Sequence, residues 1–364
     1  MILLMKSFTP NTAKNGQDKA ACVAKRSCGA KTITRPPLLN PFHHYSPNPN
    51  PTMTPHQLQA QQQRHHTQIQ NYQHQQLAQE LQDTHDYTQH THGETSPQHA
   101  QSLLNLGAWH TANGDYAAAE PLLKQAVHIQ RQHNNPTALA QALNQLGNNQ
   151  LHADQASAAQ HSQQEALSLA TDPDQIAQIH ADLGKSYYLQ ENLPKALHHY
   201  EQAAAQFEQR HGMHHPKTAQ AYTLAAAVYR QQDHAAEALS ILQHTTQILE
   251  QTAPAHHPSI AHAHCELAAT HDALKQYPQA AEHYHQASQH LAHSVGTDHP
   301  LYAKYLCRHA YHHLQTHQPE PALAQLHQAL LIFMHTYEDD HPIIHNTIQN
   351  IVLLMMMTGN DHPD

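Results

Sequence analysis

The chain has 364 residues, of which 42 are histidine, and its formal charge is −10 when every histidine is counted as neutral. Because an exposed histidine is about one-quarter protonated at pH 7, roughly ten more positive charges bring the chain close to neutrality. The chain has only 10 glycines, and aromatic residues make up 5% of it, which argues against a large β-sandwich and against a glycine-rich nucleotide-binding fold. Hydrophobic residues make up 39%, which is enough to build a sizeable core.

The first segment, residues 1–52, is predicted to be a basic leader. It holds seven Lys/Arg and one acidic residue, Asp18, whereas the remaining residues hold 11 Lys/Arg against 27 Asp/Glu. The composition changes abruptly at Met53, after a run of Pro and Asn. Three interpretations stay open: a disordered leader, a basic arm for an acidic partner, or a segment that is not translated because Met53 is the true start.

The next segment, residues 53–96, is rich in Gln and His. Its few apolar residues follow one another at roughly helical spacing. They are Leu58, Ile69, Tyr72, Leu77 and Leu81. This pattern predicts a helix that packs against the segment following it. The alternative is a polar, unpacked segment.

Internal repeats dominate residues 97–359. The dipeptide His-Pro begins at residues 215, 257, 299 and 341, with a spacing of 42 each time. A period of 20–50 residues is typical of stacked helical repeats. A small residue marks the same place in six successive units, where two helices can approach closely. These anchor residues are Gly107, Gly147, Gly184, Ala226, Ala268 and Ala310.

The repeats resemble the tetratricopeptide repeat, and the first unit carries the pattern best. Its matching residues are Leu103, Leu106, Gly107, Gly114, Tyr116, Ala119, Leu123 and Ala126. The later 42-residue units are similar to the kinesin-light-chain subclass, which begins its units with Asp-His-Pro, as at 298–300 and 340–342. The resemblance covers about 70% of the chain.

The resemblance implies an all-α fold: a right-handed superhelical solenoid of about six helix-turn-helix units preceded by the disordered leader. Four residues after the sixth unit fit a seventh first helix that caps the stack, followed by a tail at 360–364. They are Ile348, Ile351, Val352 and Met355. The apolar run at 351–357 is too short to span a membrane.

Many histidines occupy structural places in this pattern. Histidine before proline suits a helix start, because its ring can accept from a free backbone N–H. Others stand where the repeat expects a bulky core residue, and we expect packed imidazoles there. These are His110, His180, His264, His271, His309 and His313. Because burial disfavours the charged form, acid should destabilise the stack.

Metal binding is a more specific alternative function for some of these histidines. His309, His313 and His317 are spaced four apart, as a helical chelate requires, and are weak metal candidates. No HExxH, P-loop or GxSxG pattern is present, so we expect neither an enzyme nor a cofactor. The four cysteines lack a CxxC pattern, which favours free thiols and cytoplasmic residence.

The resemblance implies a non-enzymatic scaffold or adaptor that binds a peptide or partner helix in a concave groove. The groove residues are predicted on the first helices at fixed offsets from the anchors. They are Gln141, Asn144, Asn148, Lys185, Gln220, Thr223, Arg230, His262, Cys265, Lys304 and Tyr311. Nucleic acid is not expected, because the repeats are acidic. The alternative is a His-rich metal-binding or pH-responsive protein, and the sequence indicates no oligomeric state.

Overall fold

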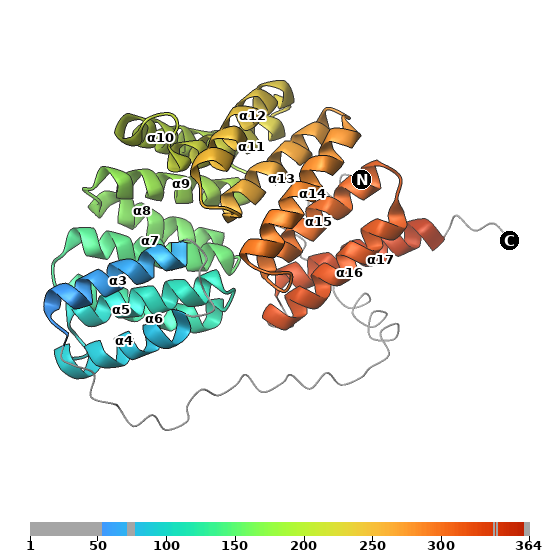
Figure 1. Ribbon diagram of the computed structural model, residues 1–364. Helices are drawn as coiled ribbons and strands as arrows, with labels where there is room; N and C mark the ends of the chain where they lie inside the picture. The colour runs from blue at the N-terminus through green and yellow to red at the C-terminus, as the bar shows by residue number, and fades with distance from the viewer. Residues whose placement is uncertain (1–52, 71–76, 338, 340, 360–364) are drawn as a thin grey trace.

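The computed structural model describes residues 53–70, 77–337, 339 and 341–359 (Figure 1). The fold is all-α, as predicted, and the fifteen helices of these ranges, joined by short turns, pack in antiparallel pairs. The predicted leader at 1–52, Tyr72 and the tail at 360–364 lie outside the described residues.

Six helix pairs follow one another, and each first helix contains one of the anchors. The first helices are α5 (Pro97–Ala112), α7 (Pro136–His152), α9 (Pro173–Leu189), α11 (Pro216–Gln231), α13 (Pro258–Ala273) and α15 (Pro300–Gln315). The second helices are α6 (Tyr116–Gln132), α8 (Ala156–Leu169), α10 (Leu193–His211), α12 (Ala235–Thr252), α14 (Tyr277–Ser294) and α16 (Pro319–Thr336). The predicted seventh first helix is α17 (Pro342–Gly359), which packs on α16.

Every first helix begins at a proline, whose fixed φ suits the first helical position and whose missing N–H costs nothing there. The histidine before it caps the helix in the later units, as predicted. The Nδ1 atoms of His215, His257 and His299 accept hydrogen bonds from the backbone N–H two residues later, at 3.1–3.2 Å. His341 does the same for Ile343 at the start of α17.

The anchors explain how closely the two helices of a pair approach. A Cβ atom added to Gly107 would lie 2.7 Å from Cγ of Leu123, and one added to Gly184 would lie 2.6 Å from the ring of Tyr200. Leu123 and Tyr200 are fully buried, so neither can move aside without disturbing the core. The small residue therefore sets the spacing of each pair.

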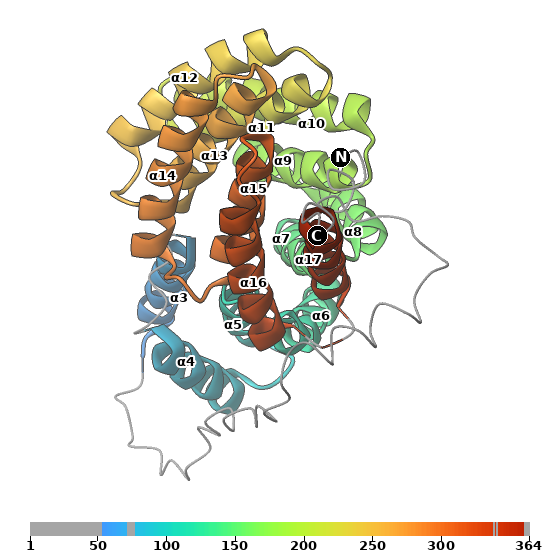
Figure 2. The ribbon, with the colours of Figure 1, turned by 90° about the vertical axis from the view of Figure 1, so that its right-hand side faces the viewer.

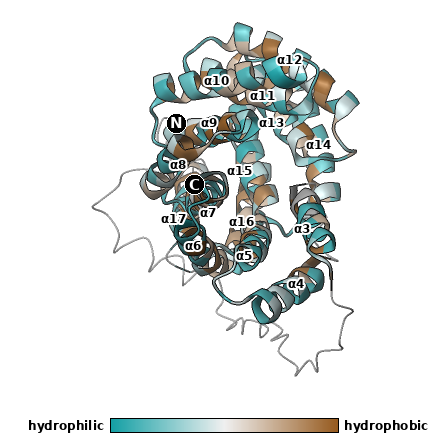
Figure 3. Cartoon of the chain, turned by 90° about the vertical axis from the view of Figure 1, so that its left-hand side faces the viewer, coloured by the Kyte–Doolittle hydropathy of each residue, from teal (hydrophilic) through white to brown (hydrophobic). Residues whose placement is uncertain are grey.

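The Gln/His-rich segment contains two helices, α3 (Pro55–Gln70) and α4 (Leu77–His92), and both contact α5. Leu77 and Leu81 are buried against Leu106 and Ala108 of the first repeat. In the hydropathy view, hydrophilic colours cover most of the outward surface of α3 and α4 (Figure 3). The two helices therefore extend the stack by covering the exposed side of α5.

The stack curves until its sixth repeat returns to its first (Figure 2). The Nε2 atom of His299, at the start of α15, donates to the carbonyl of Ala112, at the end of α5, over 2.6 Å. Beside it, the rings of Tyr116 and Tyr337 lie 5.6 Å apart, and their hydroxyls are within 3.5 Å. We call these two pairs the closure contact.

Gly114, in the turn between α5 and α6, adapts the chain to this contact. Its φ of +85° lies in the left-handed region that favours glycine. A Cβ atom on it would lie 2.8 Å from Cγ of Pro300 and 2.9 Å from Cγ2 of Thr336. The repeats consequently form a closed ring around an interior lined by first helices.

Candidate functional site: the inner surface of the ring

Polar side chains of neighbouring first helices meet on the inner side of the ring. We call the groups on α7, α9, α11, α13 and α15 that form this network the inner surface. They fall into an amide–carboxylate cluster, an arginine–glutamate cluster and a pair of lysines.

The amide–carboxylate cluster joins the second and third repeats. Asn144 and Asn148 of α7 donate to Oδ2 of Asp182 on α9, at 2.8 and 3.1 Å. Burial raises the pKa of Asp182, while the two amides and Lys185 partly oppose this effect. The cluster therefore holds a carboxylate whose negative charge is largely satisfied by its neighbours.

The arginine–glutamate cluster joins the fourth, fifth and sixth repeats. Glu266 of α13 accepts from Arg230 of α11 at 3.0 Å and from Arg308 of α15 at 2.6 Å. Burial alone would raise the pKa of Glu266, but the two guanidinium groups lower it well below its usual range. His262 lies 3.7 Å from the same carboxylate, and burial lowers the pKa of its imidazole. Two permanent positive charges thus share one negative charge.

The two lysines are Lys185 on α9, in the third repeat, and Lys304 on α15, in the sixth. Lys185 of α9 donates to Nε2 of His152, at the end of α7, over 3.4 Å. The charge of Lys185, followed by burial, holds the pKa of His152 well below its usual value, and Lys304 and His299 add to the effect. Burial and Lys185 lower the pKa of Lys304 to about 8, although Asp154 opposes them. This part of the inner surface therefore carries excess positive charge.

The predicted groove residues with exposed or half-buried side chains fall into two sets, and the buried Asn144 belongs to the first. Asn144, Asn148, Lys185, Arg230 and His262 take part in the clusters just described. Gln141, Gln220, Lys304 and Tyr311 lie half-buried on first helices.

Three predicted groove residues have buried side chains, and one of them, Asn144, is 7% exposed and bonds to Asp182. Thr223 is only 1% exposed, because its hydroxyl bonds to the carbonyl of Ala219 and to Thr245 of α12, inside the helix pair. Cys265 is 5% exposed, and burial raises the pKa of its thiol to about 12. Cys265 and Cys307 are free, as predicted, and both are buried, whereas Cys22 and Cys28 lie outside the described residues.

The prediction missed the charged residues at the centre of the clusters. Asp182, Glu266 and Arg308 all stand two residues before an anchor, in three different units. Charged residues recurring at one repeat position were the signal that could have identified them. His152 carried no such signal, because only the curvature of the ring brings it near Lys304.

The histidines form a separate column on the fifth repeat, between α13 and α14. The rings of His264 and His271 on α13 alternate with those of His283 and His290 on α14, with centroids 5.3–5.7 Å apart. His264 donates from Nε2 to Glu250 on α12 at 3.1 Å, so its Nδ1 accepts from Nδ1–H of His283 at 3.1 Å. Burial, followed by the neighbouring His283 and His290, lowers the pKa of His264 to about 4. These imidazoles are packed against one another.

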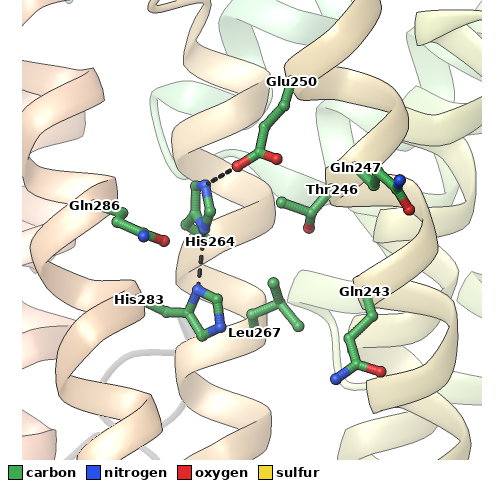
Figure 4. Close-up of a pocket in the computed structure, with 8 residues that line it drawn as sticks. All are labelled: Gln243, Thr246, Gln247, Glu250, His264, Leu267, His283 and Gln286. Atoms are coloured by element: carbon green, nitrogen blue, oxygen red, sulfur yellow. Dashed lines mark hydrogen bonds and ion pairs between the residues drawn. The ribbon is translucent and has the colours of Figure 1, made fainter.

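An open cavity of about 320 Å³ lies beside this column (Figure 4). Gln243, Gln247 and Glu250 of α12 line it together with His264 of α13 and with His283 and Gln286 of α14. Each imidazole nitrogen of His264 already has a hydrogen-bond partner. The cavity is therefore a polar surface depression rather than an enclosed ligand site.

The weak metal candidates do not form one ladder. His309 and His313 stack at 4.6 Å, but α15 ends at Gln315 and His317 has a φ of +57° in the turn that follows. Nδ1 of His309 is hydrogen-bonded to Tyr305 and Gln325, and Nδ1 of His313 donates to Gln318. Within the described ranges, no group of three or more His, Cys, Asp or Glu side chains is arranged to hold a metal ion.

Comparisons with known proteins agree with this architecture. Sequence models described as tetratricopeptide repeat match residues 99–137 and 175–251, and neither is an enzyme family. No curated protein matches the sequence. None of the helices in the described part of the chain is long and apolar enough to cross a membrane.

Solved structures with TM-scores above 0.5 share the fold at low sequence identity. A Rap protein complexed with competence and sporulation factor is 11% identical, with a TM-score of 0.61 over 84% of this chain and 89% of that one. NprR in complex with its cognate peptide NprX is 10% identical, with a TM-score of 0.59 over 85% and 87%. A putative kinesin light chain from Podosopora anserina, with TPR-like repeats, is 21% identical over 54% and 96%, with a TM-score of 0.44. With six helix pairs in one register and two matching family models, the chain is a tetratricopeptide repeat protein.

Proposed function

We propose that this chain is a non-enzymatic scaffold that binds a peptide or a helix of another protein on its inner surface. The supporting observation is the convergence of amide, carboxylate, guanidinium and ammonium groups from five first helices on one concave face. Such groups can pair with the backbone and side chains of an extended segment. The Rap and NprR structures, which share the fold, contain a sporulation factor and a cognate peptide.

We assign binding to the predicted polar residues of this face, of which Asn144 is the most buried, at 7% exposed. They are Gln141, Asn144, Asn148, Lys185, Gln220, Arg230, His262, Lys304 and Tyr311. Cytoplasmic residence belongs to the same proposal, because the four cysteines show no spacing typical of a secreted disulfide framework.

A displayed library of random peptides tests the assignment. We expect peptides selected on the wild-type chain to lose binding to a variant with Asn148→Ala and Lys185→Ala. The matched control is Lys124→Ala, because Lys124 lies on the second helix α6 and pairs only with Glu120 one turn away. Circular dichroism and a thermal melt show whether both variants fold. Selected peptides that bind the folded double variant as tightly as the wild type would refute the assignment.

A pH-responsive protein is the second candidate, and the histidine column of the fifth repeat favours it. Burial lowers the pKa of the imidazoles of His264, His283 and His290, so protonation of these packed rings is unfavourable. The two candidates differ in their requirements: a response to pH needs the column, whereas peptide binding needs the inner surface. Substitutions in one region should leave the property of the other intact.

A further inference from the structure

The two ends of the stack present opposite surfaces. At the N-terminal end, α3 and α4 turn mostly hydrophilic side chains outward (Figure 3), whereas α16 and α17 at the C-terminal end (Figure 1) expose large apolar ones. Among the residues that the structure describes, Met213 is the only other large apolar side chain that is exposed. A repeat that ends a stack in water needs a polar outer face. We call the six exposed side chains of α16 and α17, each 36–64% exposed, the apolar end: Leu331, Met334, Leu353, Met355, Met356 and Met357.

The repeat register shows which neighbour the apolar end lacks. In the fifth repeat, His264 of α13 bonds to Glu250 of α12 on one side and to His283 of α14 on the other. Two 42-residue periods later, Ile348 of α17 takes the place of His264, and Met334 of α16 takes the place of Glu250. No second helix follows α17 in the described part of the chain. The face of α17 that corresponds to the one α14 covers on α13 is therefore left uncovered.

The residues around this face change from polar to apolar. Gln247 and Glu250 of α12 line the open cavity beside the histidine column, and their equivalents on α16 are Leu331, 64% exposed, and Met334, 44% exposed. On α17, Val352 takes the anchor position, and Met355 lies one turn later on the same side of the helix. The repeat thus uses an amide and a carboxylate where this place meets water, and apolar side chains where a paired helix is lacking.

Charge and symmetry indicate a second copy of the chain as the partner of this face. Helix α17 has no Lys, Arg, Asp or Glu, and α16 has one, Glu320, in its first turn. Two copies of the apolar end can therefore meet without repulsion between like charges. About a two-fold axis, α17 of one copy runs antiparallel to α17 of the other, as the two helices of each repeat already do.

The exposed area agrees with such an interface. The six side chains of the apolar end expose roughly 500 Å² of apolar surface on one copy, which matches the largest patches left on monomers. Two copies would bury about 1,000 Å², which is the lower limit for a specific interface.

We propose that the apolar end is a homodimer interface in which α17 of each copy covers α16 and α17 of the other. A two-fold interface contains every residue twice, so one substitution changes it at two places. The proposal uses none of the residues of the inner surface and does not rest on the proposed function.

Sedimentation velocity of the full chain, from about 1 to about 100 µM, tests the dimer. We expect a wild-type dimer with a Kd of about 10 µM, and association at least about tenfold weaker for Met356→Lys, because it leaves two unpaired charges in the interface. Met213→Lys is the matched control and should dimerise as the wild type does. Circular dichroism and a thermal melt show whether both variants fold, as we expect since Met356 is 62% exposed. A wild-type monomer at about 100 µM, or equal association of the two variants, would overturn the proposal.

Hydrogen exchange at about 1 and about 100 µM locates the interface. We expect exchange in α17 and in the second half of α16 to be slower at the higher concentration for the wild type and for Met213→Lys, but not for Met356→Lys. A dimer protected elsewhere would overturn the proposal. A monomer whose α17 loses protection when residues 1–52 are deleted would assign the apolar end to that segment and overturn it as well.

The variant with Asn148→Ala and Lys185→Ala keeps the two proposals apart. We expect it to dimerise as the wild type does, because neither residue belongs to the apolar end. Loss of dimerisation in this folded variant would overturn the assignment of the interface to α16 and α17. Loss of peptide binding alone would concern only the inner surface.

Discussion

The first and fifth repeats build the same helix pair from different chemistry. Leu103, four residues before the anchor of the first repeat, corresponds to His264 in the fifth. Leu122 and Ile129 on α6 likewise correspond to His283 and His290 on α14. Leu103 is completely buried and His264 is 2% exposed. This position of the repeat thus requires a side chain that fills the space. A neutral, hydrogen-bonded imidazole fills it as leucine does, but its stability depends on pH and that of leucine does not.

The largest expected effect comes from giving the first repeat the residue of the fifth. Leu103→His removes a fully buried leucine and leaves an imidazole without the carboxylate and imidazole partners that His264 has. We expect the free energy of unfolding, measured with urea at pH 7.5, to fall by about 3–4 kcal/mol. A loss of unfolding free energy below about 1 kcal/mol would show that the first repeat tolerates an imidazole at this position. The two repeats would then not differ in the side chain they require.

The second largest expected effect is a loss of stability in acid, which should be greater for the fifth repeat than for the first. The pKa of His264 is about 4 in the folded chain, below its value of 6.5 in the unfolded chain, so the unfolded chain binds more protons between these values. The stability from this group is complete above pH 6.5 and is lost as pH falls toward 4, amounting to about 2 kcal/mol by pH 5. His264→Leu should reduce the pH dependence of the melt by about that amount. A wild-type melt unchanged between pH 7.5 and 5 would contradict the account.

The anchors provide a smaller test of how each repeat sets its helix spacing. Gly107 faces Leu123 in the first repeat, whereas Ala268 faces the buried Tyr284 in the fifth. Gly107→Ala places a Cβ atom 2.7 Å from the branch carbon of Leu123, which cannot swing away. We expect a loss of about 1–2 kcal/mol, since overpacking outweighs the gain in helix propensity. Ala268→Gly is the reciprocal control, with an expected loss of about 1 kcal/mol. An increase in stability for Gly107→Ala would show that the pair can separate freely.

The helix caps should show the smallest difference. Asp115 caps α6 by accepting from the N–H of Ala118 at 3.3 Å, while Gln276, its equivalent before α14, makes no side-chain cap. Asp115→Ala should cost about 1 kcal/mol at pH 7.5. Gln276→Ala should cost less, because that side chain bonds only to His271. Equal losses, compared by urea unfolding, would mean that the cap contributes nothing in the first repeat.

Local pattern was enough to predict the helices and their pairing. Proline at the first position, a capping side chain before it and a small anchor recur within about 40 residues, so each unit is determined by contacts between neighbours. The repeat position also decides which way a helical side chain points, and on that ground Asn144, Asn148, Lys185 and Arg230 are groove candidates whose role in binding stays a prediction. Thr223 and Cys265 were selected by the same repeat position, but their side chains are buried, which the repeat position alone does not reveal.

By itself, the sequence determined the all-α fold, the number of helix pairs in the described chain and the structural use of His-Pro. Only the tertiary structure decided the ring. The hydrogen bond from His299 to Ala112 joins residues 187 positions apart, and no single repeat encodes it. The physical reason is that small rotations between adjacent repeats accumulate along the stack, and their sum decides whether the ends meet. That sum also decides which side chains meet where the ring closes, so the contact between Tyr116 and Tyr337 became visible only in three dimensions.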